Sequence, residues 1–460
     1  MLVILGFLMV AAFMFLILTK RATPVVALIL VPVIFGLFAG AGLGIGDMIT
    51  DGIKSLAPTA ALLFFAIIFF GIMIDVGLFD PLVRGILRLV RNDPMRLVVG
   101  TAVLAMVVSL DGDGSTTFII VTSALLPLYL KLGVSPVILT VVAGLANGTM
   151  NIIPWGGPTV RAASALGISP SEVFVPMVPS LVAGLLIVLL FSVHLGLMER
   201  RRLGSLVFDQ EMVSVGGAGS DTARPARRTG GGAGGDADGG AGQFIDGLDP
   251  QRDTLRPKLL WFNAALTVAL LVVLVMDILP IPVLFMIAAS IALTVNFPKV
   301  KEQGEAIARH SASIVSVVAM VLAAAVLTGV FSGTGMVEAM AEWLLGVIPS
   351  SMGPFLAVIT GVLSIPLTFF MTNDAFYFGI LPVLTETAAQ YGIEPVEMAR
   401  ASITGQPVHL QSPLVPAILL LVTLAGVSLA DHHKKVLWRA TVVSLAMLAV
   451  GVLLGQIPMG

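Results

Sequence analysis

Two short polar segments interrupt otherwise apolar stretches of this sequence and carry its most reactive side chains. The first reads Asp111-Gly-Asp-Gly-Ser-Thr-Thr117, and the second reads Met371-Thr-Asn-Asp-Ala375. Carboxylate oxygens are the ligands that hard cations such as Mg²⁺ and Ca²⁺ prefer. We therefore predict that the metal ligands are Asp111, Asp113 and Asp374.

The hydroxyl and amide groups beside these carboxylates suit an anion. They would lie where helices begin, and there the free N–H groups and the helix dipole favour negative charge. The structural alternative is that these side chains, or one Asp, merely cap the helix that follows. The predicted anion-binding residues at the two segments are Ser115, Thr116, Thr117, Thr372 and Asn373.

Two further segments, residues 146–158 and 404–413, place Gly, Pro and polar residues inside apolar sequence, which indicates helices broken in the middle. The planar guanidinium of Arg161 suits a polycarboxylate; an ion pair with an Asp or snorkelling to the surface is the alternative. His409 could carry a proton or be a buried, hydrogen-bonded side chain. Some polar groups here must satisfy unwound backbone. The predicted substrate-binding residues of the breaks are Asn147, Asn151, Thr159, Arg161, Gln406, His409, Gln411 and Ser412.

The composition places these segments in a membrane. Of the 460 residues, 57% are hydrophobic and 11% are charged, which does not describe a soluble core. The net charge of −2 removes any compositional case for nucleic-acid binding. The absence of cysteine excludes disulfides and thiolate sites, and the 5 His show no metal-binding pair. We expect no permanently bound cofactor.

Several apolar runs have the length of about 20 residues that a bilayer crossing needs, some with interfacial help. The runs beside the first polar segment, Leu97–Leu110 and Phe118–Leu130, are too short to span alone. We expect them, and the runs around the second segment, to form re-entrant hairpins with polar tips at mid-membrane. The predicted spans are Met1–Leu18, Pro24–Leu43, Leu56–Val76, Val173–Leu197, Leu259–Met276, Ile281–Asn296, Ile314–Val330 and Val436–Leu454.

The hairpins and broken helices recur in the same order, which indicates an internal repeat. A Gly-x-x-Pro start precedes each broken helix, and aligning Pro136 with Pro395 places Asn147 on Gln406. We expect an all-α polytopic membrane protein made of two inverted-topology repeats, each with a re-entrant hairpin and a broken transmembrane helix. The predicted divisions are an N-terminal repeat over 1–198, a Gly-rich linker over 199–258 and a C-terminal inverted repeat over 259–460.

The distribution of Lys and Arg orients this layout. If each hairpin enters and leaves on one side, every basic residue except Lys54, Arg161 and Arg400 falls on the cytoplasmic side, as the positive-inside rule requires. Both termini are then extracytoplasmic, and the linker and a basic cluster at His432-His-Lys-Lys435 are cytoplasmic. Opposed hairpins and broken helices are typical of a secondary transporter whose site lies at the repeat interface.

The polar motifs resemble the citrate–metal:proton symporter family of the ion transporter superfamily. They are Ser109-Leu-Asp-Gly-Asp-Gly-Ser-Thr-Thr117, Asn151-Ile-Ile-Pro-Trp-Gly-Gly-Pro-Thr-Val-Arg-Ala162, Thr372-Asn-Asp374 and Gln406-Pro-Val-His-Leu-Gln-Ser412. The resemblance implies a transporter of the cell membrane, not an enzyme. It implies symport of protons with citrate complexed to a divalent cation, Mg²⁺ or Ca²⁺. It also implies a homodimer and an elevator-like motion.

Two other classes of membrane protein share some of these features. The sodium-coupled dicarboxylate transporters of the superfamily are similar but carry Ser-Asn-Thr at each tip, where this chain has Gly114-Ser-Thr116 and Thr372-Asn-Asp374. A metal-independent or sodium-coupled carrier of di- or tricarboxylates is the alternative. An intramembrane aspartyl protease is disfavoured, because its two Asp must face each other from full-length helices and share a proton, whereas Asp113 and Asp374 interrupt half-length segments.

The charge distribution predicts the sidedness of the linker. A single cysteine, Gly232→Cys, can be introduced into this cysteine-free chain. An impermeant thiol reagent added to intact cells should leave it unlabelled, because the linker is expected to be cytoplasmic. Gly460→Cys at the other side is the positive control. Labelling of Gly232→Cys from outside would show the inverted layout to be wrong.

Overall fold

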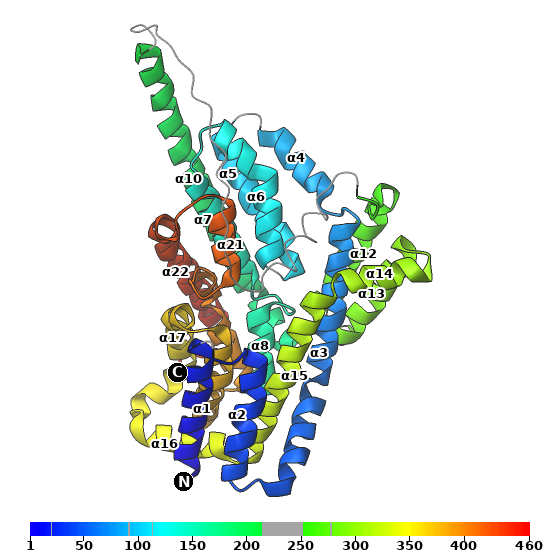
Figure 1. Ribbon diagram of the computed structural model, residues 1–460. Coiled ribbons are helices and arrows are strands. Elements are labelled where there is room, and N and C mark those ends of the chain that lie inside the picture. Colours follow the sequence, from blue (N-terminus) through cyan, green and yellow to red (C-terminus); the bar gives the residue numbers. More distant parts are fainter. Residues whose placement is uncertain (20, 91–92, 113, 214–251, 277) are drawn as a thin grey trace.

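Every regular element in the described part of the chain is a helix. The structure is a computed structural model of residues 1–460, and it describes all of them except residues 20, 91–92, 113, 214–251 and 277 (Figure 1). Eight helical segments within the described residues are long and apolar enough to cross a membrane. The predicted all-α polytopic membrane fold is therefore confirmed. The eight segments are Gly42–Asp75, Pro94–Asp111, Gly114–Lys131, Pro170–Leu203, Pro257–Leu274, Ser311–Gly333, Ser351–Phe370 and Leu429–Leu453.

The first half of the chain runs from two apolar helices into a long helix, an amphipathic helix, a hairpin, a broken helix and a second long helix. Proline stands at the first position of several of these helices, where its missing N–H costs nothing. The helices are α1 (Leu2–Leu18), α2 (Pro24–Phe38), α3 (Ile45–Asp75), α4 (Asp80–Val90), α5 (Pro94–Val108), α6 (Gly114–Lys131), α7 (Pro136–Met150), α8 (Gly157–Leu166), α9 (Pro170–Phe174) and α10 (Val178–Val213).

The second half repeats this order, although inversion of the repeats stays a prediction. A π-helical turn, η6, begins the second arm of its hairpin. The elements are α12 (Leu260–Val275), α13 (Ile281–Asn296), α14 (Val300–Arg309), α15 (Ser311–Gly333), α16 (Met336–Val347), α17 (Leu356–Phe370), η6 (Ala375–Ile380), α18 (Leu381–Ala389), α19 (Pro395–Ile403), α20 (Gln406–His409), α21 (Pro416–Leu424) and α22 (Leu429–Leu453).

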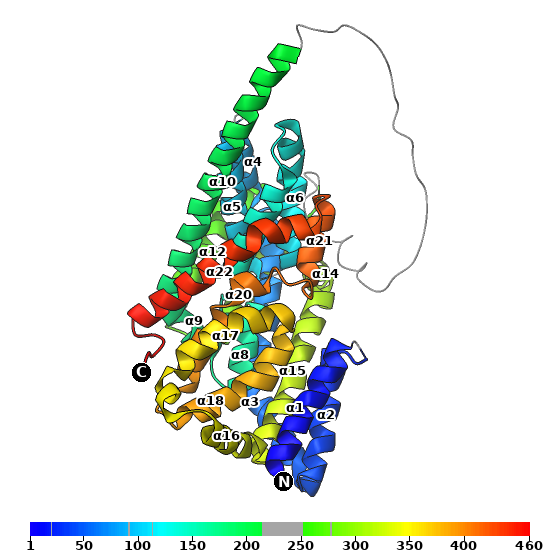
Figure 2. The same ribbon diagram turned by 90° about the vertical axis from the view of Figure 1, so that its left-hand side faces the viewer.

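The two hairpins lie toward opposite ends of the molecule. Figure 2 shows α5 and α6 in the upper part and α17 and α18 in the lower part, and Figure 1 likewise places α5 and α6 above α17. The two termini lie toward the lower end, and α10 ends at the upper end. Helix α10 therefore ends on the side of the molecule away from the two termini.

The arms of the first hairpin are longer than the apolar runs in the sequence. Pro94–Asp111 and Gly114–Lys131 each contain 18 helical residues, which is long enough to span a membrane. The apolar runs alone are too short for this. The helices continue past the apolar runs into polar and charged residues, namely Pro94-Met-Arg96 and Asp111 in the first arm and Gly114-Ser-Thr-Thr117 and Lys131 in the second.

Ordered structure also extends into both ends of the predicted linker. Helix α10 continues to Val213, beyond the predicted boundary at 198. At the other end, Arg252 is bonded to the carbonyl of Asp75 at the end of α3 (2.9 Å) and forms an ion pair with Asp80 at the start of α4 (3.1 Å). Most of the Gly-rich segment, residues 214–251, lies outside the described residues.

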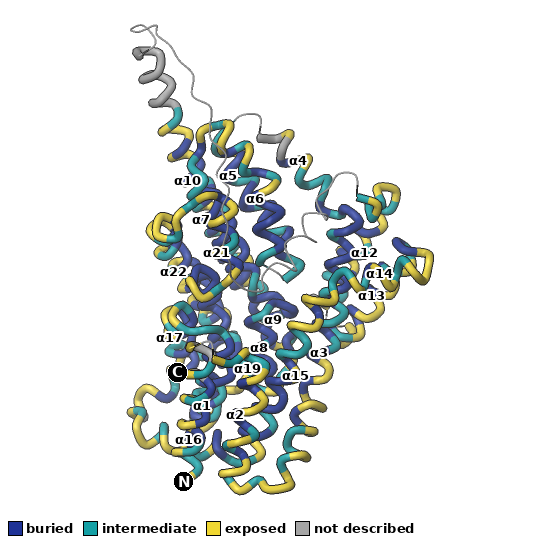
Figure 3. The backbone as a smooth tube through the Cα atoms, viewed as in Figure 1, coloured by how far each residue is buried: buried dark blue, intermediate teal, exposed yellow. Residues whose placement is uncertain are grey.

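The broken helices cross in the interior. Helix α7 is buried along nearly its whole length, from Ile138 to Met150 (Figure 3). It contacts α5, α6, α10, α20 and α22. The crossing with α20 is close because Gly148 lacks a side chain: a Cβ there would lie 3.1 Å from the Cα of Pro407. The two breaks are thus held next to each other.

A second body of helices is built around the crossing of α3 and α15, which make the most extensive helix–helix contact in the fold. The two backbones approach at Gly52 and Gly329. A Cβ added to Gly52 would meet the Ala325 carbonyl oxygen, and one added to Gly329 would meet the Met48 carbonyl oxygen. Because backbone atoms cannot move aside cheaply, this crossing requires glycine at both positions.

This crossing predicts the effect of adding one methyl group. Gly329→Ala should lower the thermal stability of the purified protein, because the new Cβ collides with the backbone of α3. Gly346→Ala, where a Cβ meets open space on an exposed turn of α16, is the control and should leave stability equal or slightly higher. The check is a melting curve in detergent. Equal melting temperatures for the two variants would contradict the crossing.

Candidate functional site

An ion pair joins the two halves of the chain at the tip of the second hairpin. Arg161 Nε lies 2.5 Å from Asp374 Oδ1, and the exposed fractions of the two side chains are 27% and 10%. Arg161 belongs to α8, just after the first break, and Asp374 lies directly before η6. Removing one partner of such a pair would leave the other as an uncompensated charge in a weakly hydrated site.

The local sequence explains how Arg161 reaches this position. Gly156 has extended backbone, and Gly157-Pro158 then begins α8, so that Arg161 lies in its early turns. A Cβ on Gly157 would lie 2.7 Å from Arg161 Nη1, and the glycine therefore leaves room for the guanidinium. The hydroxyl of Thr159 bonds to the Ile152 carbonyl at 2.7 Å and satisfies unwound backbone of the break.

The tip of the first hairpin is held by side chains of the first broken helix. Asn147 Nδ2 donates to Ser109 Oγ at 2.8 Å, and Trp155 Nε1 donates to the Leu110 carbonyl at 2.7 Å. Ser109 Oγ is also 3.3 Å from Thr117 Oγ1. Gly112 has φ +82°, a left-handed conformation that glycine adopts readily, and its Cα faces the Trp155 ring.

The predicted residues around this tip differ in exposure. Asp111 ends the short turn of the tip and is partly exposed, as is Ser115, whereas Thr116 and Thr117 are buried. Asn151 directly follows α7 and is partly exposed. Asp113, which was predicted as a metal ligand, lies outside the described residues.

The second tip is held in a corresponding way. Asn373 and Gln406 exchange amide hydrogen bonds of 3.4 and 3.2 Å, and Gln406 also donates to the Tyr377 hydroxyl at 2.9 Å. Thr372 Oγ1 accepts from the backbone N–H of Ala375 at 3.2 Å. Asn147 and Gln406, which the sequence alignment paired, thus each bond to the hairpin tip of their own half. The π-helical η6 follows directly, and such turns are frequent at functional sites.

The second break is bonded to the last turn of α17. His409 donates through Nδ1 to the Thr368 carbonyl at 2.6 Å, and the Ser412 hydroxyl donates to the Phe369 carbonyl at 2.6 Å. Gln411 Nε2 donates to the carbonyls of Gly144 and Pro407, at 3.1 and 2.9 Å. The side chain of Gln411 therefore faces protein groups of both broken helices.

Sequence reasoning missed several residues that shape the site. Ser109 and Trp155 belong to the polar motifs, but the sequence does not indicate that Ser109 bonds to the broken helix or that Trp155 bonds to the hairpin. Tyr377 follows the second tip, where an aromatic residue in apolar sequence carries no signal. His432 was predicted to belong to a solvated basic cluster. Its side chain is instead fully buried, because α22 packs it against α7 and the second break.

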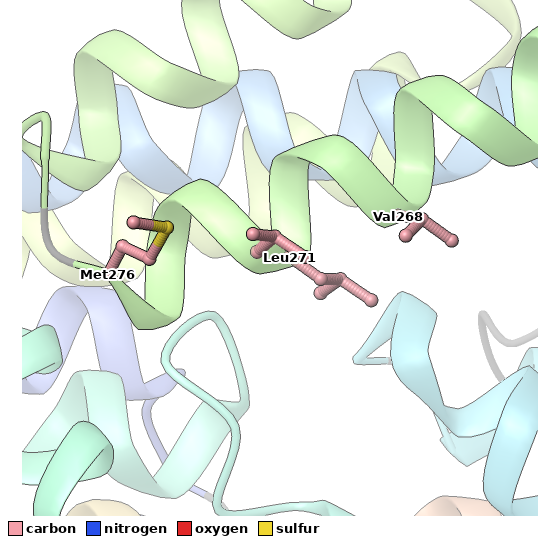
Figure 4. Close-up of a pocket in the computed structure, with 4 residues that line it drawn as sticks. Val268, Leu271 and Met276 are labelled. Carbon is pink, nitrogen blue, oxygen red and sulfur yellow. The ribbon is translucent and has the colours of Figure 1, made fainter.

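The described residues offer few ligands for a bare metal ion. Within that part of the chain, no three His, Asp or Glu side chains gather closely enough to hold one. Two cavities among the described residues do not suit a citrate-sized anion. One of about 330 Å³ along α12 is lined only by Val268, Leu271, Val272 and Met276 (Figure 4). Another, of about 260 Å³ between α8, α15 and α18, has a carboxylate, Glu386, in its wall.

Comparison with known proteins identifies the family. The protein-family model described as "Citrate transporter" matches residues 13–405. A "Citrate transporter" and a "Mg(2+)/citrate complex secondary transporter" of Bacillus subtilis (strain 168) are each 47% identical over 458 residues, which is 99% of this chain and 100% and 99% of theirs. The crystal structure of the Alcanivorax borkumensis YdaH transporter, with 12% identity, has a similar fold with a TM-score of 0.55 over 90% of this chain and 88% of that one. As its motifs indicated, the chain belongs to the citrate transporter family, and it is a multi-pass membrane transporter, not an enzyme.

Proposed function

We propose that this protein is a secondary transporter that carries citrate, complexed with Mg²⁺ or Ca²⁺, in symport with protons. Two relatives, each 47% identical, bear names that specify citrate and a Mg²⁺–citrate complex. The single observation that carries the proposal is the pairing of Arg161 with Asp374 between the hairpin tip and the break.

The pair explains why a complex would be preferred to either ion alone. Free citrate is close to trivalent at neutral pH; it could bind Arg161 but would then place negative charge beside Asp374. A free divalent cation could bind Asp374 but would be repelled by Arg161. The complex presents both signs at once, so a citrate carboxylate replaces Asp374 on the guanidinium while the cation takes up the released carboxylate. No buried charge then stays uncompensated.

The scarcity of protein ligands also supports a complex. A Mg²⁺ or Ca²⁺ ion needs six or more oxygen ligands, roughly, and citrate supplies several of them itself. Asp374, Asp111 and Asp113 are the protein carboxylates that we assign to the cation. The hydroxyl and N–H groups where α6 and η6 begin would receive the remaining carboxylates of citrate, as helix N-termini bind anions.

The proton has two candidate carriers. His409 uses Nδ1 for the Thr368 carbonyl, which leaves Nε2 as the nitrogen that would take up or release a proton. Asp374 is the other candidate, as an alternative to its role as a ligand of the cation. The orientation that we propose has both termini extracytoplasmic, with the linker cytoplasmic, and the working unit is a homodimer.

Neutralising Asp374 tests the role of the metal. Asp374→Asn should lower the uptake of metal citrate by roughly tenfold or more, because it removes a cation ligand and leaves Arg161 without its partner. The measurement is radiolabelled citrate uptake into proteoliposomes with Mg²⁺, Ca²⁺ or a chelator, under separate proton and sodium gradients. Chelation should abolish wild-type uptake. Equal wild-type uptake in excess chelator would favour a metal-independent carrier, and uptake driven by sodium alone would favour a sodium-coupled one.

Removing both charges separates stability from binding. Arg161→Gln and Asp374→Asn should each lower the melting temperature, and the double variant should recover most of that loss, because no unpaired charge is left. Citrate uptake should stay low in the double variant. The matched control is the exposed pair Lys54 and Asp51, 71% and 74% exposed, whose corresponding Lys54→Gln and Asp51→Asn variants should change neither quantity. Uptake at the wild-type level in the Arg161 and Asp374 double variant would show that the pair takes no part in binding.

A further inference from the structure

A buried hydrogen-bond network ties the second break to the first broken helix and to α22. His432 of α22 has no exposed surface. Its Nε2 lies 3.0 Å from Gln411 Oε1, and its Nδ1 lies 3.1 Å from Thr140 Oγ1 of α7. One imidazole therefore bridges the loop of the second break and the helix that precedes the first.

The hydrogen-bond directions in this network follow from Gln411. Its Nε2 donates to the carbonyls of Gly144 and Pro407, so its Oε1 must be the acceptor toward His432. The Nε2 of His432 therefore carries a proton. The Nδ1 then lies 3.1 Å from the Thr140 hydroxyl, whose single proton is shared between this nitrogen and the Val137 carbonyl at 2.9 Å. Each ring nitrogen thus has a protein partner in a region where an unpaired polar group would be costly.

The network lies beside the irregular backbone of the second break. Helix α20 has only four residues, Gln406–His409, and four predicted ligands lie within it or in the three residues that follow. Glycine at position 144 permits the close approach, since a Cβ there would lie 2.7 Å from Gln411 Oε1. Without the bond from His432, the Gln411 oxygen would lose its donor, and the amide would be less firmly held between the two broken helices.

We propose that His432 is a positioning residue for substrate binding. Through the side chain of Gln411 it holds the second break against α7, so that both breaks present their ligands in fixed relation. Neither His432 nor Gln411 needs to touch citrate for this role. The proposal rests on the proposed transport of metal citrate, and it reassigns Gln411, which the sequence suggested as a substrate ligand, to the support of the site.

Three substitutions of His432 separate its two bonds. His432→Gln places an amide N–H near the position of Nε2 and keeps the donor to Gln411. His432→Asn keeps a polar group near Nδ1 and Thr140 but is too short to reach Gln411. His432→Leu removes both. Thr149→Val is the matched control, because it deletes a buried hydroxyl of α7 whose bond, to the Leu145 carbonyl at 2.7 Å, stays within its own helix.

The first readout is the concentration dependence of Mg²⁺–citrate uptake in proteoliposomes. His432→Leu and His432→Asn should raise KM by about tenfold, the scale of one lost buried hydrogen bond, with little change in the maximal rate per folded protein. His432→Gln should stay within about threefold of wild type by the same reasoning. Gln411→Leu should resemble His432→Leu, and the double variant should be no worse than either single variant, because both act through one contact.

The second readout does not depend on the substrate. Amide hydrogen exchange of residues 405–415 in the purified protein should be faster in His432→Leu than in wild type, and unchanged in Thr149→Val. If His432→Gln is as impaired as His432→Leu, or if the His432 and Gln411 effects add, the positioning role is wrong. If wild type fails to carry metal citrate while exchange still responds to His432→Leu, the proposed function has failed and the structural link stands. If exchange does not respond, the link itself is refuted.

Discussion

A membrane protein cannot leave backbone N–H and C=O groups facing lipid, and two broken helices at the centre of this fold make that constraint acute. The breaks are tolerated because side chains of the breaks themselves and of α22 take up the unwound groups. Thr159 bonds to the Ile152 carbonyl in the first break. In the second, Gln411 bonds to the Pro407 carbonyl, Ser412 Oγ accepts from the Leu414 N–H, and His433 of α22 donates to the Gln411 carbonyl. The same polar residues that make a ligand site conceivable are therefore the ones that allow the backbone to be irregular there.

Because polar residues at the breaks serve either the backbone or a ligand, they fall into two groups. Gln411 is bonded to protein groups on both sides, whereas Arg161 and Asp374 face each other with part of their surface exposed. A charged pair that is partly exposed is able to exchange partners, whereas a fully buried amide network serves to hold shape. The site therefore combines buried, hydrogen-bonded amides that hold its shape with one ion pair, Arg161 and Asp374. A ligand that carries both positive and negative charge would separate this pair.

The sequence predicted the apolar helices of the fold, its hairpins and its breaks, but not the shorter helices α4, α14 and α16. Apolar length predicts the spans, Pro136 and Pro395 mark the starts of the broken helices, and the Gly and Pro residues mark the breaks, because each of these signals is local. The helix ends were less well predicted. The arms of the first hairpin extend past the apolar runs into polar residues, from Pro94 to Asp111 and from Gly114 to Lys131.

The sequence by itself determined that the chain lies in a membrane, that its carboxylates stand in two interrupted hairpins, and which amides flank the breaks. Only the tertiary structure decided the partners. Arg161 and Asp374 are far apart in the chain, and His432 belonged by composition to a basic surface cluster. Composition and hydrophobic periodicity indicate only the local structural preference of each residue. Which buried charge meets which, and which imidazole meets which amide, follows from how the helices cross, and that crossing depends on the packing of residues such as Gly148 against Pro407.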